Sequence, residues 1–283
     1  MAYITVDSCK LYYTVQGQGT PIIFFHPPVL THFNFKCQME ELSKYFRVIT
    51  FDIRGHGRSS FSKQPLTYPL IAEDAKRILD HLRIQKAFIC GYSTGGSIAL
   101  EFLLSHADRA NGGIIISGMS EVSDWVLKNK IALGIALAKS KALSTLALSV
   151  SWTNTVTLSS FWKMVREDKK GNIQNIEEYY RYSLSYNCTD RLEKIKHPVL
   201  LVYGKKDKIF YRYAKLLHHK LPNNELKWIE NVKHQIPTKA AFELNEFIRQ
   251  FIHTHEEPEV EVNQTNPHYF FESDALQEHD FQV

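Results

Sequence analysis

Short hydrophobic runs alternate with amphipathic stretches over the first 118 residues of the chain. The runs are uninterrupted, as is typical of strands that are buried on both faces of a parallel sheet. The stretches between them repeat apolar positions every three or four residues, as amphipathic helices do. The pattern predicts strands at 21–25, 47–51, 87–90 and 113–116, and helices at 34–45, 70–82 and 95–106.

The alternation stops after residue 118 and later resumes. Residues 119–195 contain no convincing strand and several amphipathic helical stretches. Farther along, the pattern predicts strands at 199–203 and 226–229 and helices at 211–221 and 238–253. At the other end of the chain, the β-rich segments 3–6 and 11–15 indicate an antiparallel hairpin.

Together these elements predict an α/β fold with a mostly parallel central sheet flanked by helices, because strands that alternate with helices form crossover units. Residues 1–118 and 196–253 would form this core, and residues 119–195 would form an inserted helical lid.

The composition is that of an ordinary globular protein. Of the 283 residues, 44% are hydrophobic and 23% are charged, which excludes wholesale disorder and collagen-like repeats. The four cysteines lie far apart, without a CxxC pair or a zinc-ligand spacing, so we expect reduced thiols and no metal site. The N-terminus lacks the basic and apolar regions of a secretory signal, which favours a cytoplasmic protein.

The net charge of +4 hides two oppositely charged parts. Residues 1–253 carry 34 basic and 22 acidic side chains, net +12, whereas residues 254–283 carry eight acidic side chains and no lysine or arginine. The basic residues are scattered, so no nucleic-acid partner is predicted. The acidic tail is predicted to be disordered; the alternative is that its aromatic cluster at 269–271 docks on the basic body. The apolar segment 142–152 is too short to span a bilayer, so no membrane span is predicted.

The strongest chemical signal is the segment GYSTGG at residues 91–96, between a predicted strand and a predicted helix. A serine on so sharp a turn needs small neighbours, because the backbone on either side passes close to it. The hydroxyl of Ser93 would then project at the carboxyl end of the sheet. There the N-terminus of the following helix favours developing negative charge.

Other segments follow predicted strands in a consistent order. His26 follows the strand PIIFF, DIRGHGRS at 52–59 follows the strand RVITF, and GKKD at 204–207 and then His234 follow the last two strands. With GxSxG, these segments make the chain resemble the α/β-hydrolase family over about residues 1–253. The resemblance implies that family's fold and a serine-dependent reaction without a metal or organic cofactor.

Carried over by position, the resemblance implies Ser93 as the nucleophile, His234 as the general base and acid, and Asp207 as the carboxylate that orients His234. A serine hydroxyl is a weak nucleophile until an imidazole takes its proton, and the imidazole needs a partner that fixes its tautomer. Glu121 and Asp124 remain alternatives for the acid, since some members of the family place it after the preceding strand.

The loop that follows the first buried strand departs from the family pattern. The resemblance implies that one oxyanion donor is the backbone amide of Thr94, and that the second comes from the residue two positions after His26. That residue is Pro28, which has no N–H group. Either a shifted loop donates from Val29 or Leu30, of which Val29 is the prediction, or the oxyanion hole is incomplete.

An insertion at the carboxyl ends of the strands would cover the site as a lid. Aromatic residues are plentiful in it, and those not used for packing would line an apolar pocket for a small, hydrophobic, uncharged substrate. The predicted substrate-binding residues are His26, Tyr92, Trp125 and Trp162.

These observations predict a serine hydrolase that cleaves a carboxylic ester or a related acyl bond of a small molecule through an acyl-enzyme. Lactone hydrolysis, thioester hydrolysis, carbon–carbon bond cleavage and haloperoxidase-like activity use the same residues in this family, so they stay open. A receptor that binds a small ligand with little or no catalysis is the alternative from another class, and Pro28 is the residue that favours it.

Overall fold

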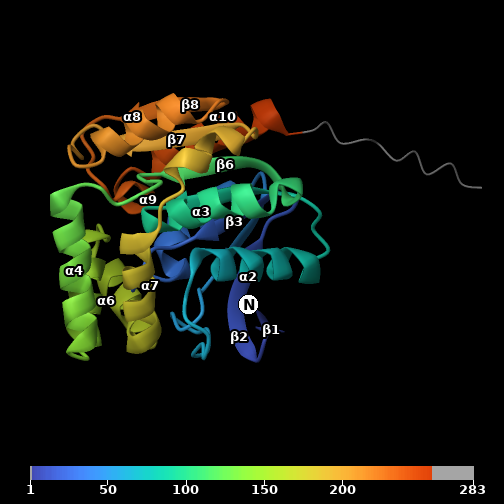
Figure 1. The fold of residues 1–283 in the computed structure, drawn as a ribbon. Helices are drawn as coiled ribbons and strands as arrows, with labels where there is room; N and C mark the ends of the chain where they lie inside the picture. The colour runs from blue at the N-terminus through green and yellow to red at the C-terminus, as the bar shows by residue number, and fades with distance from the viewer. Residues whose placement is uncertain (1, 257–283) are drawn as a thin grey trace, which may run out of the picture.

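The computed structural model describes residues 2–256 and contains an eight-stranded sheet (Figure 1). Its order is β1-β2-β4-β3-β5-β6-β7-β8; β2 pairs antiparallel with β1 and β4, and the other neighbours are parallel. The predicted α/β fold is therefore confirmed. The strands are β1 Ala2–Val6, β2 Cys9–Gln16, β3 Pro21–Phe25, β4 Arg47–Phe51, β5 Ala87–Tyr92, β6 Ala110–Ile116, β7 Val199–Gly204 and β8 Asn224–Ile229.

Helices cover both faces of this sheet because its central strands are apolar on both sides. In β3, Ile23 and Phe25 join the hydrophobic cluster shared with α2, α3 and α8, whereas Ile22 and Phe24 join the cluster shared with α1 and α10. The core helices are η1 His32–Phe35, α1 Lys36–Leu42, α2 Tyr68–His81, α3 Thr94–Ser105, η2 Ala107–Arg109, η3 Thr189–Lys194, α8 Tyr211–Lys220, α9 Ile236–Lys239 and α10 Ala241–His255.

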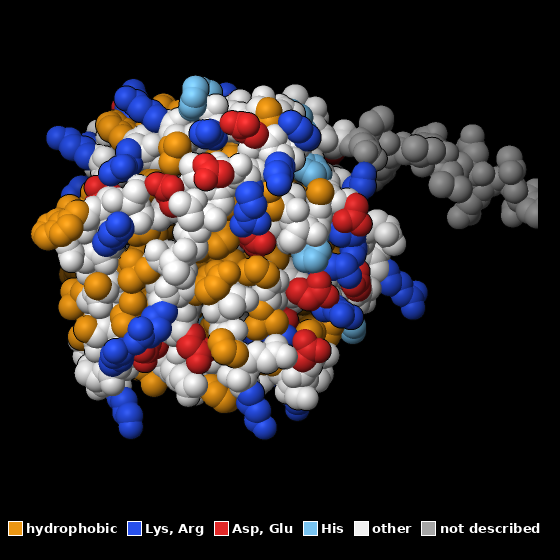
Figure 2. All heavy atoms as spheres, viewed as in Figure 1, with side chains coloured by type: hydrophobic (Ala, Val, Ile, Leu, Met, Phe, Trp, Pro, Cys, Tyr) orange, Lys and Arg blue, Asp and Glu red, His pale blue; other side chains and the backbone are white. Residues whose placement is uncertain are grey.

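Four helices lie between β6 and β7, and we call them the helical insertion: α4 Trp125–Lys139, α5 Leu143–Thr153, α6 Leu158–Asp168 and α7 Ile173–Ser185. An isolated antiparallel bridge between Glu121 and Asn187 holds its two ends side by side. Figure 1 shows α4, α6 and α7 gathered at one side of the sheet. Figure 2 shows hydrophobic side chains concentrated on that part of the surface, with charged side chains spread over the rest.

The predicted C-terminal boundary at residue 253 lies close to the end of α10 at His255. The predicted disorder of the acidic tail lies outside the described residues from residue 257 onward. Within the described part of the chain, no helix has both the length and the apolar character that a bilayer span requires.

Candidate active site

Ser93 sits on a strained turn between β5 and α3. Its φ of 57° and ψ of −123° are rare for a residue with a side chain, and such strain is common at functional sites. The turn is possible because two neighbours are glycines. A Cβ on Gly91 would lie 2.1 Å from the carbonyl oxygen of Gly95, and a Cβ on Gly95 would lie 2.1 Å from that of Phe25.

Asp207 and His234 are brought to the same place by the ends of β7 and β8. The amide of Lys206 donates to the carbonyl of Val232 at 2.9 Å, so the two loops run side by side. Gly204 allows this approach, because a Cβ there would lie 2.3 Å from the backbone carbonyl oxygen of Lys233.

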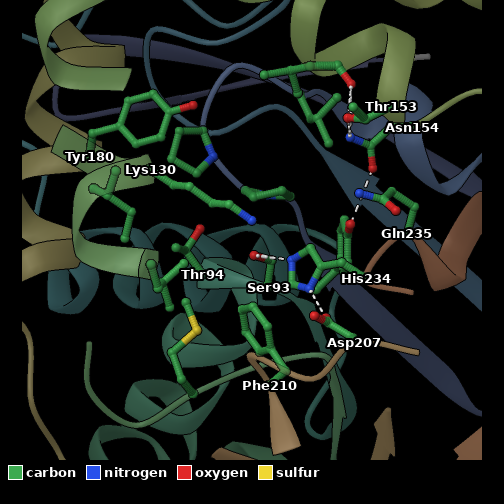
Figure 3. Close-up of a pocket in the computed structure, with 18 of the residues that line it drawn as sticks. Ser93, Thr94, Lys130, Thr153, Asn154, Tyr180, Asp207, Phe210, His234 and Gln235 are labelled. Atoms are coloured by element: carbon green, nitrogen blue, oxygen red, sulfur yellow. Dashed lines mark hydrogen bonds and ion pairs between the residues drawn. The ribbon is translucent and has the colours of Figure 1, made fainter. Parts of the chain in front are cut away.

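The three side chains form a continuous hydrogen-bonded chain (Figure 3). His234 Nε2 lies 2.9 Å from Ser93 Oγ, and His234 Nδ1 lies 2.9 Å from Asp207 Oδ2. In the neutral tautomer that fits both bonds, Nδ1–H donates to the carboxylate and Nε2 accepts from the serine hydroxyl. The ring of Phe210 covers the imidazole, with centroids 4.2 Å apart. This geometry lets the imidazole take the proton of Ser93 while the carboxylate holds the ring in place.

The alternative carboxylates are engaged elsewhere. Glu121 accepts hydrogen bonds from Asn187 and Thr189 at the base of the helical insertion. Asp124 caps α4 by accepting from the amide of Leu127 at 3.0 Å. Among the described residues, Asp207 is the carboxylate that contacts His234.

A cavity of about 460 Å³ opens beside Ser93 and His234. Its size suits a small-molecule substrate. Its walls are mostly apolar and come from the core loops and from the helical insertion. Tyr92, one of the predicted substrate-binding residues, lines it, and its hydroxyl donates to Asn154 Oδ1 at 3.2 Å.

His26 is placed differently from the prediction, because it does not line this cavity. Its side chain is fully buried, Nδ1–H donates to the carbonyl of Pro27, and Nε2 accepts from the amide of Ile53, both at 2.9 Å. Burial lowers the pKa of His26 to about 4, so the ring is neutral at physiological pH. In the structure its two hydrogen bonds hold the loop after β3, and its ring lies away from the cavity.

The two tryptophans predicted to bind substrate do not line the cavity either. Trp125 is 76% exposed at the start of α4, and Trp162 is 58% exposed on α6. Their side chains point to the surface of the helical insertion, so the predicted role in the pocket does not fit their positions.

The predicted oxyanion donors are the backbone amides of Thr94 and Val29. Thr94 begins α3 and lines the cavity, and within residues 2–256 no hydrogen-bond acceptor engages its amide or that of Val29. Val29 has a φ of 72°, which is exceptional for a β-branched residue, and its side chain is buried under the helical insertion. The loop after Pro28 thus has an unusual, tightly held conformation.

Several lining residues were not predicted: Leu127, Lys130, Asn154 and Phe210. Tyr180, which also lines the cavity, is one of the aromatic residues of the insertion that were expected to divide between packing and the pocket. The only indication of Phe210 in the sequence is its position three residues after Asp207, across a tight turn. Lys130 follows Leu127 by three residues on α4, a helical spacing that places both on neighbouring positions of one face.

Among residues 2–256, no group of three or more His, Cys, Asp or Glu side chains is arranged to hold a metal ion.

Comparison with known proteins agrees with this architecture. The family model described as alpha/beta hydrolase fold matches residues 20–237, and the chain belongs to this family. It is a hydrolase of the α/β-hydrolase superfamily.

Relatives match nearly the whole chain. The AB hydrolase superfamily protein YisY of Bacillus subtilis is 27% identical, with 87% of this chain and 97% of that protein covered. The bifunctional esterase/perhydrolase DCH of Acinetobacter calcoaceticus is 24% identical, with 89% and 99% covered. The esterase EaEST of Exiguobacterium antarcticum has a similar fold, with a TM-score of 0.81, 20% identity and coverage of 89% of this chain and 98% of that one.

Proposed function

We propose that this protein is a serine hydrolase that cleaves a carboxylic ester or a related acyl bond of a small molecule through an acyl-enzyme. The observation that carries the proposal is the unbroken chain from Ser93 Oγ through His234 to Asp207 at the wall of a mostly apolar cavity. The names of the relatives, which include esterases, support the same class of reaction.

In the proposed first step, Ser93 Oγ attacks the ester carbonyl as its proton passes to His234 Nε2. The imidazolium that forms is stabilised by Asp207. Collapse of the tetrahedral intermediate breaks the bond to the alcohol, which leaves with the proton from Nε2, and the acyl group stays on Ser93. Water then attacks the acyl group in the reverse sense, with His234 again acting as base.

The negative charge of each intermediate needs donors that are already in position. The amide of Thr94 at the N-terminus of α3 is the first donor in this proposal, and the amide of Val29 is the second. The unusual φ of Val29 supports a shifted loop, because Pro28 has no N–H group to offer. A missing second donor would cost about 10²–10³ in turnover.

The helical insertion is proposed to act as the lid of this site. Its helices supply part of the cavity wall, and its two ends are joined at the bridge between Glu121 and Asn187. The proposed compartment is the cytoplasm, since all four cysteines are free thiols.

Labelling with a fluorophosphonate, which reacts with activated serines, tests the proposal directly. We expect the wild-type protein to be labelled and to hydrolyse short p-nitrophenyl esters. Ser93→Ala should lose labelling and lower turnover by at least about 10³-fold, because the nucleophile is gone. Ser105→Ala, at the exposed end of the same helix, is the matched control and should be labelled as the wild type is.

Two results would overturn the proposal. Absence of labelling in the wild type would favour the alternative, a receptor that binds small ligands in the same cavity. Equal labelling of the wild type and Ser93→Ala would show that another residue is the reactive group.

A further inference from the structure

Lys130 brings an uncompensated positive charge into the cavity beside Ser93. The charged side chains that line the cavity are Lys130 and Asp207, and Asp207 is already bound to His234. No hydrogen bond or ion pair engages the Lys130 ammonium within the described part of the chain. Figure 3 shows Lys130 extending from α4 toward Ser93.

The position of Lys130 on α4 explains why its charge reaches the cavity. Its neighbours Leu127 and Ile131 are buried and also line the cavity, so Lys130 lies at the edge of the face that α4 turns inward. The methylene groups of a lysine can lie along such an apolar surface while the ammonium stays free to bind. Lys128 and Lys130 are both exposed residues of this helix, but Lys128 does not line the cavity.

A second donor lies on the same side of the cavity. Tyr180 of α7 lines it, and no hydrogen-bond partner engages the Tyr180 hydroxyl among residues 2–256. Burial raises the pKa of Tyr180, so the hydroxyl stays protonated and can donate. An ammonium and a hydroxyl together suit a carboxylate, which accepts hydrogen bonds and carries the opposite charge.

We propose that Lys130 selects substrates whose acyl chain ends in a carboxylate, a few carbon atoms from the scissile carbonyl. The methylene groups of such a chain would lie against the apolar wall, and the carboxylate would pair with Lys130 and accept from Tyr180. This inference rests on the proposed function and replaces the uncharged substrate that the sequence predicts. Lys130 is then a specificity-determining residue for esters of dicarboxylic acids.

Two esters of equal chain length test this selectivity: monoethyl glutarate, which carries the carboxylate, and ethyl valerate, which ends in a methyl group. The measured quantity is the ratio of kcat/KM for the charged ester to that for the neutral ester. We expect Lys130→Met to lower this ratio about tenfold, mainly through KM, because a charged hydrogen bond is lost. Lys130→Arg should keep most of the preference, and Lys128→Met, the matched control, should keep the wild-type ratio.

The inference is overturned if Lys130→Met leaves the ratio unchanged. This includes the case in which both esters lose the same factor in kcat/KM, since Lys130 would then act on the reacting carbonyl and not on specificity. Because Lys130 is reached by solvent, about 1 M salt should weaken the preference of the wild type.

A binding measurement separates this inference from the proposed hydrolysis. N-ethylglutaramic acid and N-ethylvaleramide are the amide counterparts of the two esters, and calorimetry with the wild type and Lys130→Met requires no ester cleavage. Tighter binding of the charged amide that depends on Lys130 supports the inference even if neither ester is hydrolysed. Equal binding of both amides by the wild type would overturn the inference and leave the serine-hydrolase proposal intact.

Discussion

Two buried histidines near the candidate site are neutral in the folded protein. Burial lowers the pKa of His26 to about 4 and that of His56 to about 3, and their ring centroids lie 5.3 Å apart. Protonation of either ring would place a charge on a side chain that is fully buried. Folding therefore becomes less favourable in the pH range where the unfolded chain holds protons that the folded chain excludes.

The sign of this effect can be followed for His26. Above its ordinary pKa of about 6.5 the ring is neutral in both states, and below that value only the unfolded state gains the proton. The free energy of unfolding should fall as the pH drops from about 6.5 to about 4, by up to about 3 kcal/mol for this residue. The free energy of unfolding, measured by urea denaturation across this range, should depend less steeply on pH in His26→Gln. The difference in slope should correspond to about one bound proton. His219→Gln, an exposed control on α8, should keep the wild-type slope, and an equal slope in all three proteins would contradict the prediction.

Single residues differ in how far the sequence predicts them. Ser93, Asp207 and His234 each follow a strand of the sheet within a recognisable segment, so their meeting at one edge of the sheet follows from the topology. His26 occupies an equally recognisable segment, but a motif does not tell whether a side chain faces the cavity or the core beneath it. Lys130 has the pattern of a residue on a solvated helix face, and only the placement of α4 brings it to the cavity.

At the scale of elements, α7 packs into the hydrophobic core and does more than cover the site from outside. Tyr179 of α7 is fully buried in the main hydrophobic cluster, and its hydroxyl donates to the backbone carbonyl of His26 at 2.9 Å. Its ring also packs edge-on against Tyr68 of α2. The last helix of the insertion is thus part of the core that supports the loop after β3.

The replacement of Tyr179 by phenylalanine measures this connection. We expect Tyr179→Phe to lower the free energy of unfolding by about 1–3 kcal/mol, because the carbonyl of His26 loses its buried donor. Tyr182→Phe is the matched control on the same helix. Its hydroxyl has no hydrogen-bond partner among residues 2–256, and the change should stay within about 0.5 kcal/mol. Equal losses in denaturant unfolding would show that the hydrogen bond is not what joins α7 to the core.

The strands of the sheet could be predicted well from the sequence, whereas the individual helices of the insertion could not. Each central strand contains a short apolar run, whereas the exposed Leu133 of α4 and Leu148 of α5 interrupt the expected division into apolar and polar faces. For the same reason the exposed Trp125 and Trp162 could not be told from pocket residues: aromatic content does not specify direction. A helix that packs against the rest of the protein with only part of its surface can keep apolar side chains on its outer face. The periodicity of the sequence then does not show which face is buried.

At the scale of the whole molecule, charge is distributed very unevenly along the chain. Residues 1–256 carry 34 basic and 23 acidic side chains, net +11, and the following 27 residues carry seven acidic side chains and no lysine or arginine. A body of this charge attracts anions over the Debye length, and the attraction disappears when salt shortens that length. An anionic ester would therefore approach the body faster at low ionic strength than a neutral ester of the same size.

Truncation after Glu256 tests whether net charge acts in this way. It raises the net charge from +4 to +11 and leaves Glu256 in place, whose carboxylate accepts from Thr20 Oγ1 at 2.8 Å. At about 0.01 M salt, where the Debye length is about 30 Å, we expect the truncated protein to have a several-fold higher kcat/KM for monoethyl glutarate than the full chain. At about 1 M salt the two proteins should be equal, and ethyl valerate should show no difference at either concentration. An increase in kcat/KM that persists at high salt, or that appears with both esters, would mean that residues 257–283 act on the site by contact and not through their charge.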